Sequence, residues 1–183
     1  MSSITSDPID VLSFWWQAGP EKWFQSDDAF DEAIRSQFGG LYEQAFAGTL
    51  DHWAEAPHGA LALVIVLDQF PRNMFRKSPK AFQSDQKALS VANRAVDRNF
   101  HLAFPAPARD FFFMPFEHAE DMEAQEKAVD LFRAYCDEQG HLYALIHMDV
   151  IRRFGRFPHR NDVLGRQSSE SEIAFLAKGG FSA

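Results

Sequence analysis

The stretch from His147 to Arg166 concentrates side chains that bind anions and transfer protons. It reads HMDVIRRFGRFPHRNDVLGR and holds five arginines against two acids, in a chain whose formal net charge is −8. A guanidinium group binds a carboxylate or a phosphate through two parallel hydrogen bonds. A histidine titrates near neutral pH and therefore serves as an acid or as a base. The stretch predicts a polar site that attracts small anionic molecules.

A shorter copy of this pattern lies upstream, where the sequence reads LDQFPRN from Leu67 to Asn73. Phe-Pro-Arg-Asn at 70–73 and Phe-Pro-His-Arg-Asn at 157–161 each follow an apolar segment with helical character. We expect these two Phe-Pro turns to lie against one pocket and to supply its ligand-binding residues. The expected ligand-binding residues are Arg72, Asn73, Arg156, Arg160, Asn161 and Arg166.

Five ionisable residues fall on helix faces that the apolar pattern places inside the protein. Projection of the predicted helices at 100° per residue identifies them as Asp85, Glu117, His118, Asp121 and His147. Burying such groups without partners costs roughly several kcal/mol, so they must meet one another or the arginines of the Phe-Pro turns. Their number exceeds what is needed to hold two turns in place, which favours a functional cleft.

Acid–base chemistry on a bound anion is the first function that fits these residues. Arg72, Arg160 and Arg166 would hold the anion, and a histidine, His147 or His159, would act as the base. A neighbouring carboxylate would tune the pKa of that histidine. The candidate catalytic residues are His147, His118, Asp121, Glu117 and His159, with Asp85 as a further carboxylate beside the base.

Metal-assisted hydrolysis is a second function that fits. His118, His147, Asp121 and Glu117 would bind a divalent cation that activates water. Glu117 and Asp121 are four residues apart, so both would lie on one helix face. The chain has no His-Glu-x-x-His sequence, and its residues do not identify a metal, another cofactor or a substrate.

A peptide-binding scaffold without chemistry is the alternative. A groove between helices would bind a helix or an extended peptide of a partner protein, and the buried charges would be structural. Asp68 would pair with Arg72, Asp85 would belong to the same structural network, and carboxylates would pair with Arg156 or Arg160.

Nucleophilic catalysis has little support in the sequence. Cys136 lies on the core face of a predicted helix, and neither a Gly-x-Ser-x-Gly elbow nor a Gly-rich phosphate loop occurs. The remaining histidines fall in turns or at helix ends, where we expect them at the surface. These are His52, His58, His101 and His141.

The apolar pattern predicts about seven or eight helices and no convincing strand. The segment GALALVIVLDQF, residues 59–70, is apolar on every side, as expected of a central buried helix. Short connections predict antiparallel helical hairpins stacked in layers, in a single all-helical domain that spans 1–183. The helices that would carry the site residues are expected at 78–98, 115–139 and 142–154, and a capping box at Ser169–Glu172 predicts a short closing helix.

Composition limits the kind of partner. A pI of about 5.3 argues against nucleic acid, which needs a broad basic face. No apolar run reaches the ~20 residues of a membrane span, and the first residues do not read as a signal peptide. A single cysteine is typical of the reducing cytoplasm, where we expect the protein. The aromatic residues between 15 and 24 are compatible with a homodimer.

Three motifs are spread over much of the chain: Asp68-Gln69-Phe70-Pro71-Arg72-Asn73, Met114-Pro115 with His118-Ala119-Glu120-Asp121, and the stretch from Phe154 to Arg166. Together they resemble an uncharacterised, mainly bacterial family that is known only as a domain of unknown function. The resemblance implies an all-helical, tetratricopeptide-like fold and, by analogy, a peptide-binding groove. It brings no established activity, substrate or cofactor. The family usually has a serine where this chain has Ala119.

Overall fold

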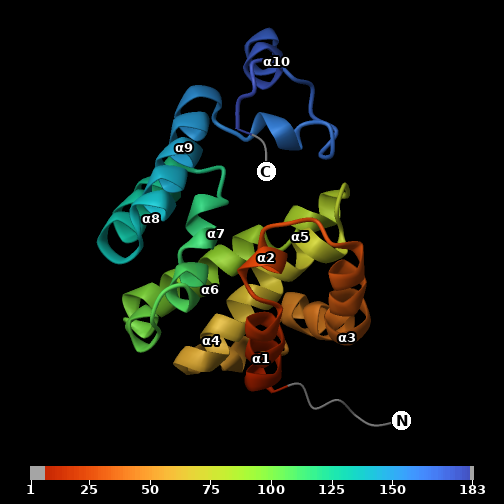
Figure 1. The fold of residues 1–183 in the computed structure, drawn as a ribbon, viewed down its shortest axis with the longest axis vertical. Helices are drawn as coiled ribbons and strands as arrows, with labels where there is room; N and C mark the ends of the chain where they lie inside the picture. Colours follow the sequence, from red (N-terminus) through yellow and green to blue (C-terminus); the bar gives the residue numbers. More distant parts are fainter. Residues whose placement is uncertain (1–6, 182–183) are drawn as a thin grey trace.

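The computed structural model describes residues 7–181 as helices joined by turns, with no strand in that range (Figure 1). Its longer helices, of eight residues or more, are α1 (Pro8–Ala18), α3 (Asp28–Ala47), α4 (Pro57–Val64), α6 (Asp85–Asp97), α8 (Met122–Tyr135), α9 (Glu138–Phe154) and α10 (Glu170–Ala177). The short helices are α2 (Pro20–Trp23), α5 (Phe70–Met74) and α7 (Met114–Glu117). The predicted all-helical fold is therefore confirmed. Within the same range, no helix is both long and apolar enough to cross a membrane.

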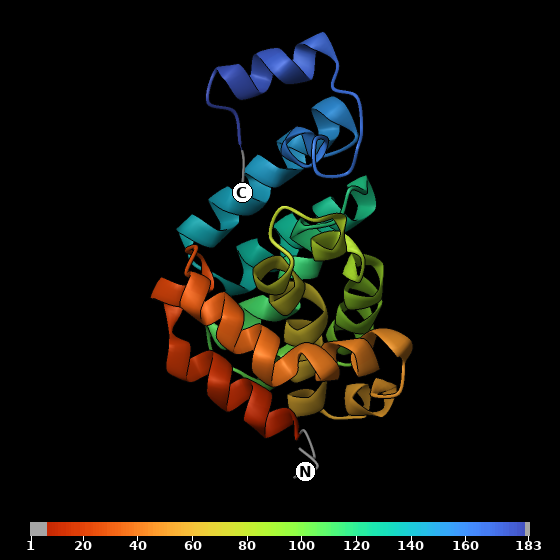
Figure 2. The same cartoon turned by 90° about the vertical axis from the view of Figure 1, so that its right-hand side faces the viewer.

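Helices α4 and α5 form the centre of the protein as one continuous helical segment. Every residue from Gly59 to Pro71 is buried, because this segment is apolar on all sides and has no face suited to water. Helices α1, α3 and α6 pack around it. Figure 2 shows α1 and α3 at the end of the molecule opposite α10. The predicted central helix is confirmed, and it continues for one turn beyond its expected end, to Met74.

A single π-helical turn, Ile65–Gln69, lies between α4 and α5. Such turns are rare and are frequently found at functional sites. Pro71 is the second residue of α5 and has no N–H, so it cannot donate to the carbonyl of Leu67, four residues earlier, as an α-helix would require. The hydroxyl of Ser84 replaces that donor by binding the Leu67 oxygen at 2.6 Å, and Ser84 is fully buried. Asp68 belongs to this turn, which places its carboxylate in the interior.

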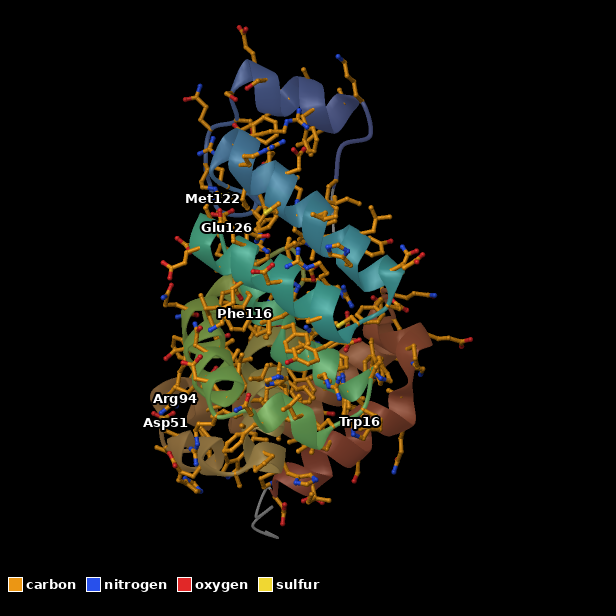
Figure 3. All side chains as sticks on the ribbon, turned by 90° about the vertical axis from the view of Figure 1, so that its left-hand side faces the viewer. Trp16, Asp51, Arg94, Phe116, Met122 and Glu126 are labelled. Carbon is orange, nitrogen blue, oxygen red and sulfur yellow. The ribbon has the colours of Figure 1, made fainter. Side chains whose placement is uncertain are left out.

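The prediction of one continuous helix over 115–139 is wrong. Helix α7 ends at Glu117 and α8 begins at Met122, with a non-helical polar stretch between them. Helix α8 then ends at Tyr135 instead of continuing toward the next glycine. In Figure 3, Met122 and Glu126 mark the first turns of α8.

Side-chain hydrogen bonds explain this interruption. The carboxylate of Asp121 accepts the N–H of Ala124 at 2.9 Å and so starts α8 as its N-cap. The amide of Gln125, which is fully buried, donates to the carbonyls of Glu117 and Ala119 at 2.7 and 2.8 Å. These carbonyls have no helical donor beyond the end of α7, so Gln125 stabilises the break.

Helices α8 and α9 form an antiparallel hairpin with a short connection. Gly140 does not separate them as predicted, because the carboxylate of Asp137 caps α9 by accepting the Gly140 N–H at 2.8 Å. A Cβ atom at Gly140 would lie 3.1 Å from the ring of Phe132, so glycine allows the two helices to approach closely. The hairpin fits the predicted architecture, whereas a tetratricopeptide-like arrangement of the whole chain stays a prediction.

The helix predicted over 78–98 is also divided. A 3₁₀ turn, Pro79–Phe82, comes first, and α6 begins only at Asp85. The buried Ser84 lies at the junction, where its hydroxyl binds the central helix as described above. This tertiary hydrogen bond competes with a continuous helix, and the apolar pattern alone does not reveal it.

The part of the chain that follows α9 packs on the C-terminal end of α9 and forms a second, smaller apolar cluster with it. A 3₁₀ turn, Pro158–Arg160, leads toward α10, which begins with a capping box between Ser169 and Glu172, as predicted. We call its apolar centre the C-terminal cluster. Its fully buried members are Val150, Ile151 and Phe157, against which Met122, Phe154, Phe175 and Phe181 pack.

Candidate functional site

Asp68 and His118 form the centre of a buried polar cluster. The Nδ1 atom of His118 lies 2.9 and 3.0 Å from the two carboxylate oxygens of Asp68, whose side chain is only 1% exposed. The amide of Gln69 donates to the same carboxylate at 2.6 Å. An ionised carboxylate only accepts hydrogen bonds, so Nδ1 carries the proton and Nε2 of His118 is left as a potential base.

The surroundings keep this pair as a carboxylate and a neutral imidazole. Burial disfavours the charged form of Asp68, but Arg72 and His118 outweigh it, so the pKa of Asp68 is lowered. Burial lowers the pKa of His118, and the positive charge of Arg72 lowers it further. At neutral pH the imidazole is therefore unprotonated at Nε2 and available to accept a proton.

Arg72 connects the two carboxylates of the cluster. Its Nη1 and Nη2 atoms donate to Asp85 at 3.0 and 3.1 Å, in a bidentate pair. Nη1 also lies 3.4 Å from Oδ1 of Asp68 and donates to the Asp68 carbonyl at 2.6 Å. Arg72 thus has partners within the protein in place of the predicted ligand, and its contacts support the position of Asp68.

Arg160 comes from the second Phe-Pro turn and lies between two aromatic rings. The central carbon of its guanidinium group is 4.7 Å from the centroid of Phe82 and 4.4 Å from that of Phe157. Nη1 donates to the His118 carbonyl at 3.1 Å and lies 3.6 Å from Oδ2 of Asp85. Nε has no hydrogen-bond partner among the described residues. Burial lowers the pKa of Arg160 to about 10, so it stays charged at pH 7 with unused donor capacity.

Glu117 and His147 form a second pair beside His118. Nδ1 of His147 donates to the Tyr143 carbonyl at 2.8 Å and lies 3.2 Å from Oε1 of Glu117, and the two histidine rings are 6.5 Å apart. Burial, together with the charge of Asp68, raises the pKa of Glu117 to about 8. Burial lowers the pKa of His147 to about 3. The close contact is therefore not an ion pair at pH 7, and Glu117 keeps its proton.

His159, the other predicted base, lies at the edge of the cluster. Its ring centroid is 5.6 Å from that of Phe157. Burial lowers the pKa of His159 to about 4, and the neighbouring charge of Arg160 acts in the same direction. Its Nδ1 atom has no partner within residues 7–181, so no carboxylate orients this ring as Asp68 orients His118.

Two predicted site residues lie outside the cluster. Asp121 is exposed at the start of α8, because the helix that was to turn it inward is interrupted. Arg156 donates through Nε and Nη2 to Glu172 at 2.7 and 2.8 Å and so connects α10 to the turn after α9. The structure therefore does not bring Asp121 or Arg156 to the cluster that the other predicted residues form.

Other predicted ligand-binding residues hold loops in place. Asn73 donates to Asp31 at 2.8 Å. Arg166 donates to both carboxylate oxygens of Glu120 at 2.6 and 2.9 Å and to Asn161 at 2.9 Å. Glu120 also accepts a backbone N–H of the second Phe-Pro turn. These contacts position the turn that carries Arg160 and leave Asn73, Asn161 and Arg166 without a direct place in the cluster.

Two members of the cluster, Gln69 and Phe82, are not among the residues predicted from the sequence. Gln69 is the second polar residue in an otherwise apolar helix, beside Asp68, and that placement is a signal that could have found it. Phe82 gives no local signal, because its role depends on its tertiary contact with Arg160. A further expectation is wrong: His101, expected at the surface, is only 2% exposed.

The geometry does not support the metal hypothesis. Among residues 7–181, no group of three or more His, Cys, Asp or Glu side chains is placed to hold a metal ion. Nδ1 of His118 is bound to Asp68, Nδ1 of His147 is bound to a backbone carbonyl, and Asp121 lies elsewhere. The four predicted ligands therefore do not converge on one point.

Two surface depressions on the described part of the chain lie away from the cluster. One of about 190 Å³ lies against α6, and another of about 460 Å³ lies between α9 and α10. Neither is lined by Asp68, His118 or Arg160.

The sequence matches, over residues 11–180, a family described as bacterial proteins of unknown function (DUF924). The match covers most of the chain, so this protein belongs to that family, and the predicted resemblance is confirmed. A solved structure of a protein of unknown function from Agrobacterium tumefaciens is 40% identical in sequence, with a TM-score of 0.91. That alignment covers 94% of this chain and 97% of the other. No curated protein matches the sequence.

Proposed function

We propose that the buried cluster binds a small anionic molecule at Arg160 and exchanges a proton with it through His118. The contact of the Asp68 carboxylate with Nδ1 of His118 carries this proposal. A carboxylate that fixes one imidazole nitrogen sets the tautomer and leaves the other nitrogen as a base. An oriented base of this kind is what proton transfer to or from a bound molecule requires.

Arg160 supplies the anion contact. Its guanidinium group is almost fully buried, and its Nε atom lacks a partner in the described part of the chain. An unused charged donor in a region of low dielectric favours a carboxylate or a phosphate strongly. Stacking between Phe82 and Phe157 fixes the plane of the group, so less conformational entropy is lost when an anion binds.

Glu117 is the corresponding proton donor. Its raised pKa keeps it protonated at pH 7, whereas the imidazole of His118 is neutral at the same pH. A site that holds one acid and one base in these states is prepared for acid–base chemistry, including hydrolysis. The substrate class that this arrangement fits is a small carboxylate or phosphate compound.

The test measures ligand binding and the proton uptake that accompanies it. Wild-type protein is screened by thermal unfolding against carboxylated and phosphorylated metabolites, and each hit is titrated calorimetrically in two buffers of different ionisation enthalpy. We expect Arg160→Gln to weaken binding at least about tenfold. His118→Asn should abolish proton uptake, since asparagine retains a donor toward Asp68 but lacks Nε2. Arg133→Gln and His52→Asn, at exposed positions, are the matched controls.

Two results would contradict the proposed anion site. One is that no anion stabilises the wild-type protein. The other is that Arg160→Gln binds the best anion as tightly as Arg133→Gln does. Proton uptake that survives in His118→Asn would leave the anion site intact and remove His118 from the proton-transfer role.

A peptide-binding scaffold is the second candidate function. Helix α9 exposes Leu142, Tyr143 and Leu145 with exposed fractions of 51%, 47% and 37%, and this apolar face would suit a partner's helix or a second copy of the chain. Under this alternative the polar cluster is structural. His118→Asn and Arg160→Gln would then lower stability without altering the binding of any small anion.

A further inference from the structure

The ring of Phe181 lies against the histidines of the cluster. Its centroid is 4.3 Å from that of His147, 5.5 Å from that of His159 and 6.3 Å from that of Phe157. His147 and Phe157 are buried, so the ring rests on an interior surface made of other rings. Phe157 stacks in turn on the guanidinium group of Arg160 at 4.4 Å. Phe181 is therefore separated from the proposed anion contact by a single aromatic ring.

The segment that carries Phe181 is shaped to return to the cluster after α10. The chain reverses at Gly179, whose φ of +75° suits glycine. The N–H of Gly180 donates to the carbonyl of Phe175 at 3.0 Å, and a Cβ atom at Gly180 would lie 2.6 Å from the Phe175 ring. Within residues 7–181 no backbone-to-backbone hydrogen bond holds Phe181 itself. The side chain of His159 contacts the backbone of Phe181. The ring of Phe181 itself is held by side-chain contacts that another ring could replace.

We propose that Phe181 occupies a subsite for an aromatic group of the ligand and leaves when the ligand binds. The inference rests on the proposed function, because Arg160 would hold the anionic group beside this ring. His147, His159 and Phe157 line the subsite, and aromatic rings favour offset and edge-to-face contacts of the kind Phe181 makes there. The ligand class is therefore an aromatic carboxylate or an aryl phosphate.

The substitution Phe181→Ala tests the subsite because it removes the ring and keeps the backbone. Binding of phenylacetate, acetate and benzyl alcohol is measured at pH 7 by calorimetry. These probes carry a ring with an anion, an anion alone and a ring alone. We expect phenylacetate to bind Phe181→Ala at least about tenfold more tightly than it binds wild type, and about tenfold more tightly than acetate binds the same variant.

Two further variants complete the experiment. Phe24→Ala removes a ring that is 65% exposed and does not belong to the cluster, so its binding should match that of wild type. Phe181→Leu keeps apolar bulk without the ring and serves if Phe181→Ala is poorly folded. Phe181→Leu should also bind phenylacetate more tightly than wild type does, because a flexible aliphatic side chain fills the subsite less well than a ring.

The outcomes separate the subsite from the proposed function. If phenylacetate and acetate bind Phe181→Ala equally, the aromatic subsite is overturned and the anion site stands. If phenylacetate and benzyl alcohol bind equally, the subsite is supported and the anion contact at Arg160 is overturned, and with it the proposed function. If none of the probes binds Phe181→Ala or Phe181→Leu, the subsite is overturned.

Discussion

Glu117 and His147 lie 3.2 Å apart at their nearest atoms, yet neither carries a charge at pH 7. Burial penalises the charged form of both groups, so the acid keeps its proton and the base remains without one. Asp68 is buried more deeply but stays ionised, because Arg72 and His118 stabilise its negative charge. The cluster therefore holds a carboxylate, a carboxylic acid and neutral imidazoles side by side. Such differences between neighbouring groups are what acid–base chemistry uses.

Glu117→Gln should stabilise the protein in alkaline solution. The pKa of Glu117 rises from its ordinary value of 4.5 to about 8 on folding. Below pH 4.5 both states hold the proton, and between pH 4.5 and 8 the unfolded state alone loses it. The free energy of unfolding therefore falls over that window by up to about 1.4 kcal/mol per pH unit. Glutamine cannot ionise, so chemical denaturation should show that the stability of Glu117→Gln relative to wild type rises between pH 4 and pH 8.5, by a gain on the order of 5 kcal/mol.

Glu126→Gln is the matched control for this measurement. Glu126 is exposed on α8, where its side chain is labelled in Figure 3, and its substitution should leave the pH dependence unchanged. A Glu117→Gln variant with the same pH dependence as wild type would mean that Glu117 is ionised in the folded protein. It could not then serve as the proton donor that the proposed function requires.

At the scale of helices and turns, apolar periodicity predicts which segments are helical but does not locate their interruptions. The segment 59–70 is correctly identified because its apolar residues surround the helix axis. The breaks before α6 and α8 depend on Ser84 and Gln125, whose side chains bind carbonyls of other segments. The apolar pattern of a single predicted helix carries no information about such hydrogen bonds to other segments. Asp121 is consequently misplaced, since it lies just beyond the break in its helix.

The same reasoning explains how much of the cluster could be predicted. Glu117, His118 and His147 were expected inside because each lies near an apolar helix face, and the structure brings them together. Their partners could not be assigned from the pattern. Asp68 and His118 are 50 residues apart, so their contact follows from how the π-helical turn before α5 packs against the end of α7. Phe181 comes from a segment whose path depends on packing after α10.

Ser84→Ala should destabilise the central helix at its π-helical turn. The Ser84 hydroxyl is the donor to the Leu67 carbonyl, which Pro71 leaves without a helical N–H. Removing it leaves a buried carbonyl without a partner, at a cost of about 1–3 kcal/mol. Urea-induced unfolding measures this loss. Ser90→Ala, at an exposed position of α6, should change stability by less than about 0.5 kcal/mol.

A double-mutant cycle gives this prediction its control. Pro71→Ala restores an N–H that can bind the Leu67 carbonyl, so Ser84→Ala should cost less in that background than in wild type. An equal cost in both backgrounds would show that the hydroxyl stabilises the protein through packing alone. The carbonyl would then not depend on Ser84.

For the molecule as a whole, apolar packing separates the described chain into a main core and the C-terminal cluster. Figure 1 shows α10 and the turn after α9 at one end of the molecule, away from α1, α3 and α4. Polar contacts connect this end to the rest, chiefly Arg166 with Glu120 and Arg160 with the His118 carbonyl. Regions with few buried apolar contacts open at lower free energy than the core. The segment that carries Phe181 belongs to such a region.

Arg166→Gln should make this region open more often without affecting the core. The variant loses a bidentate contact with Glu120, in which both side chains are 24% exposed, so we expect a cost of about 1 kcal/mol and about fivefold faster amide exchange in α10. Exchange in α4 should not change, as measured by hydrogen–deuterium mass spectrometry. Arg152→Gln, at an exposed ion pair on α9, is the control. If α10 and α4 accelerate together, the chain opens as one unit, and Phe181 could leave its subsite only by local movement of its own segment.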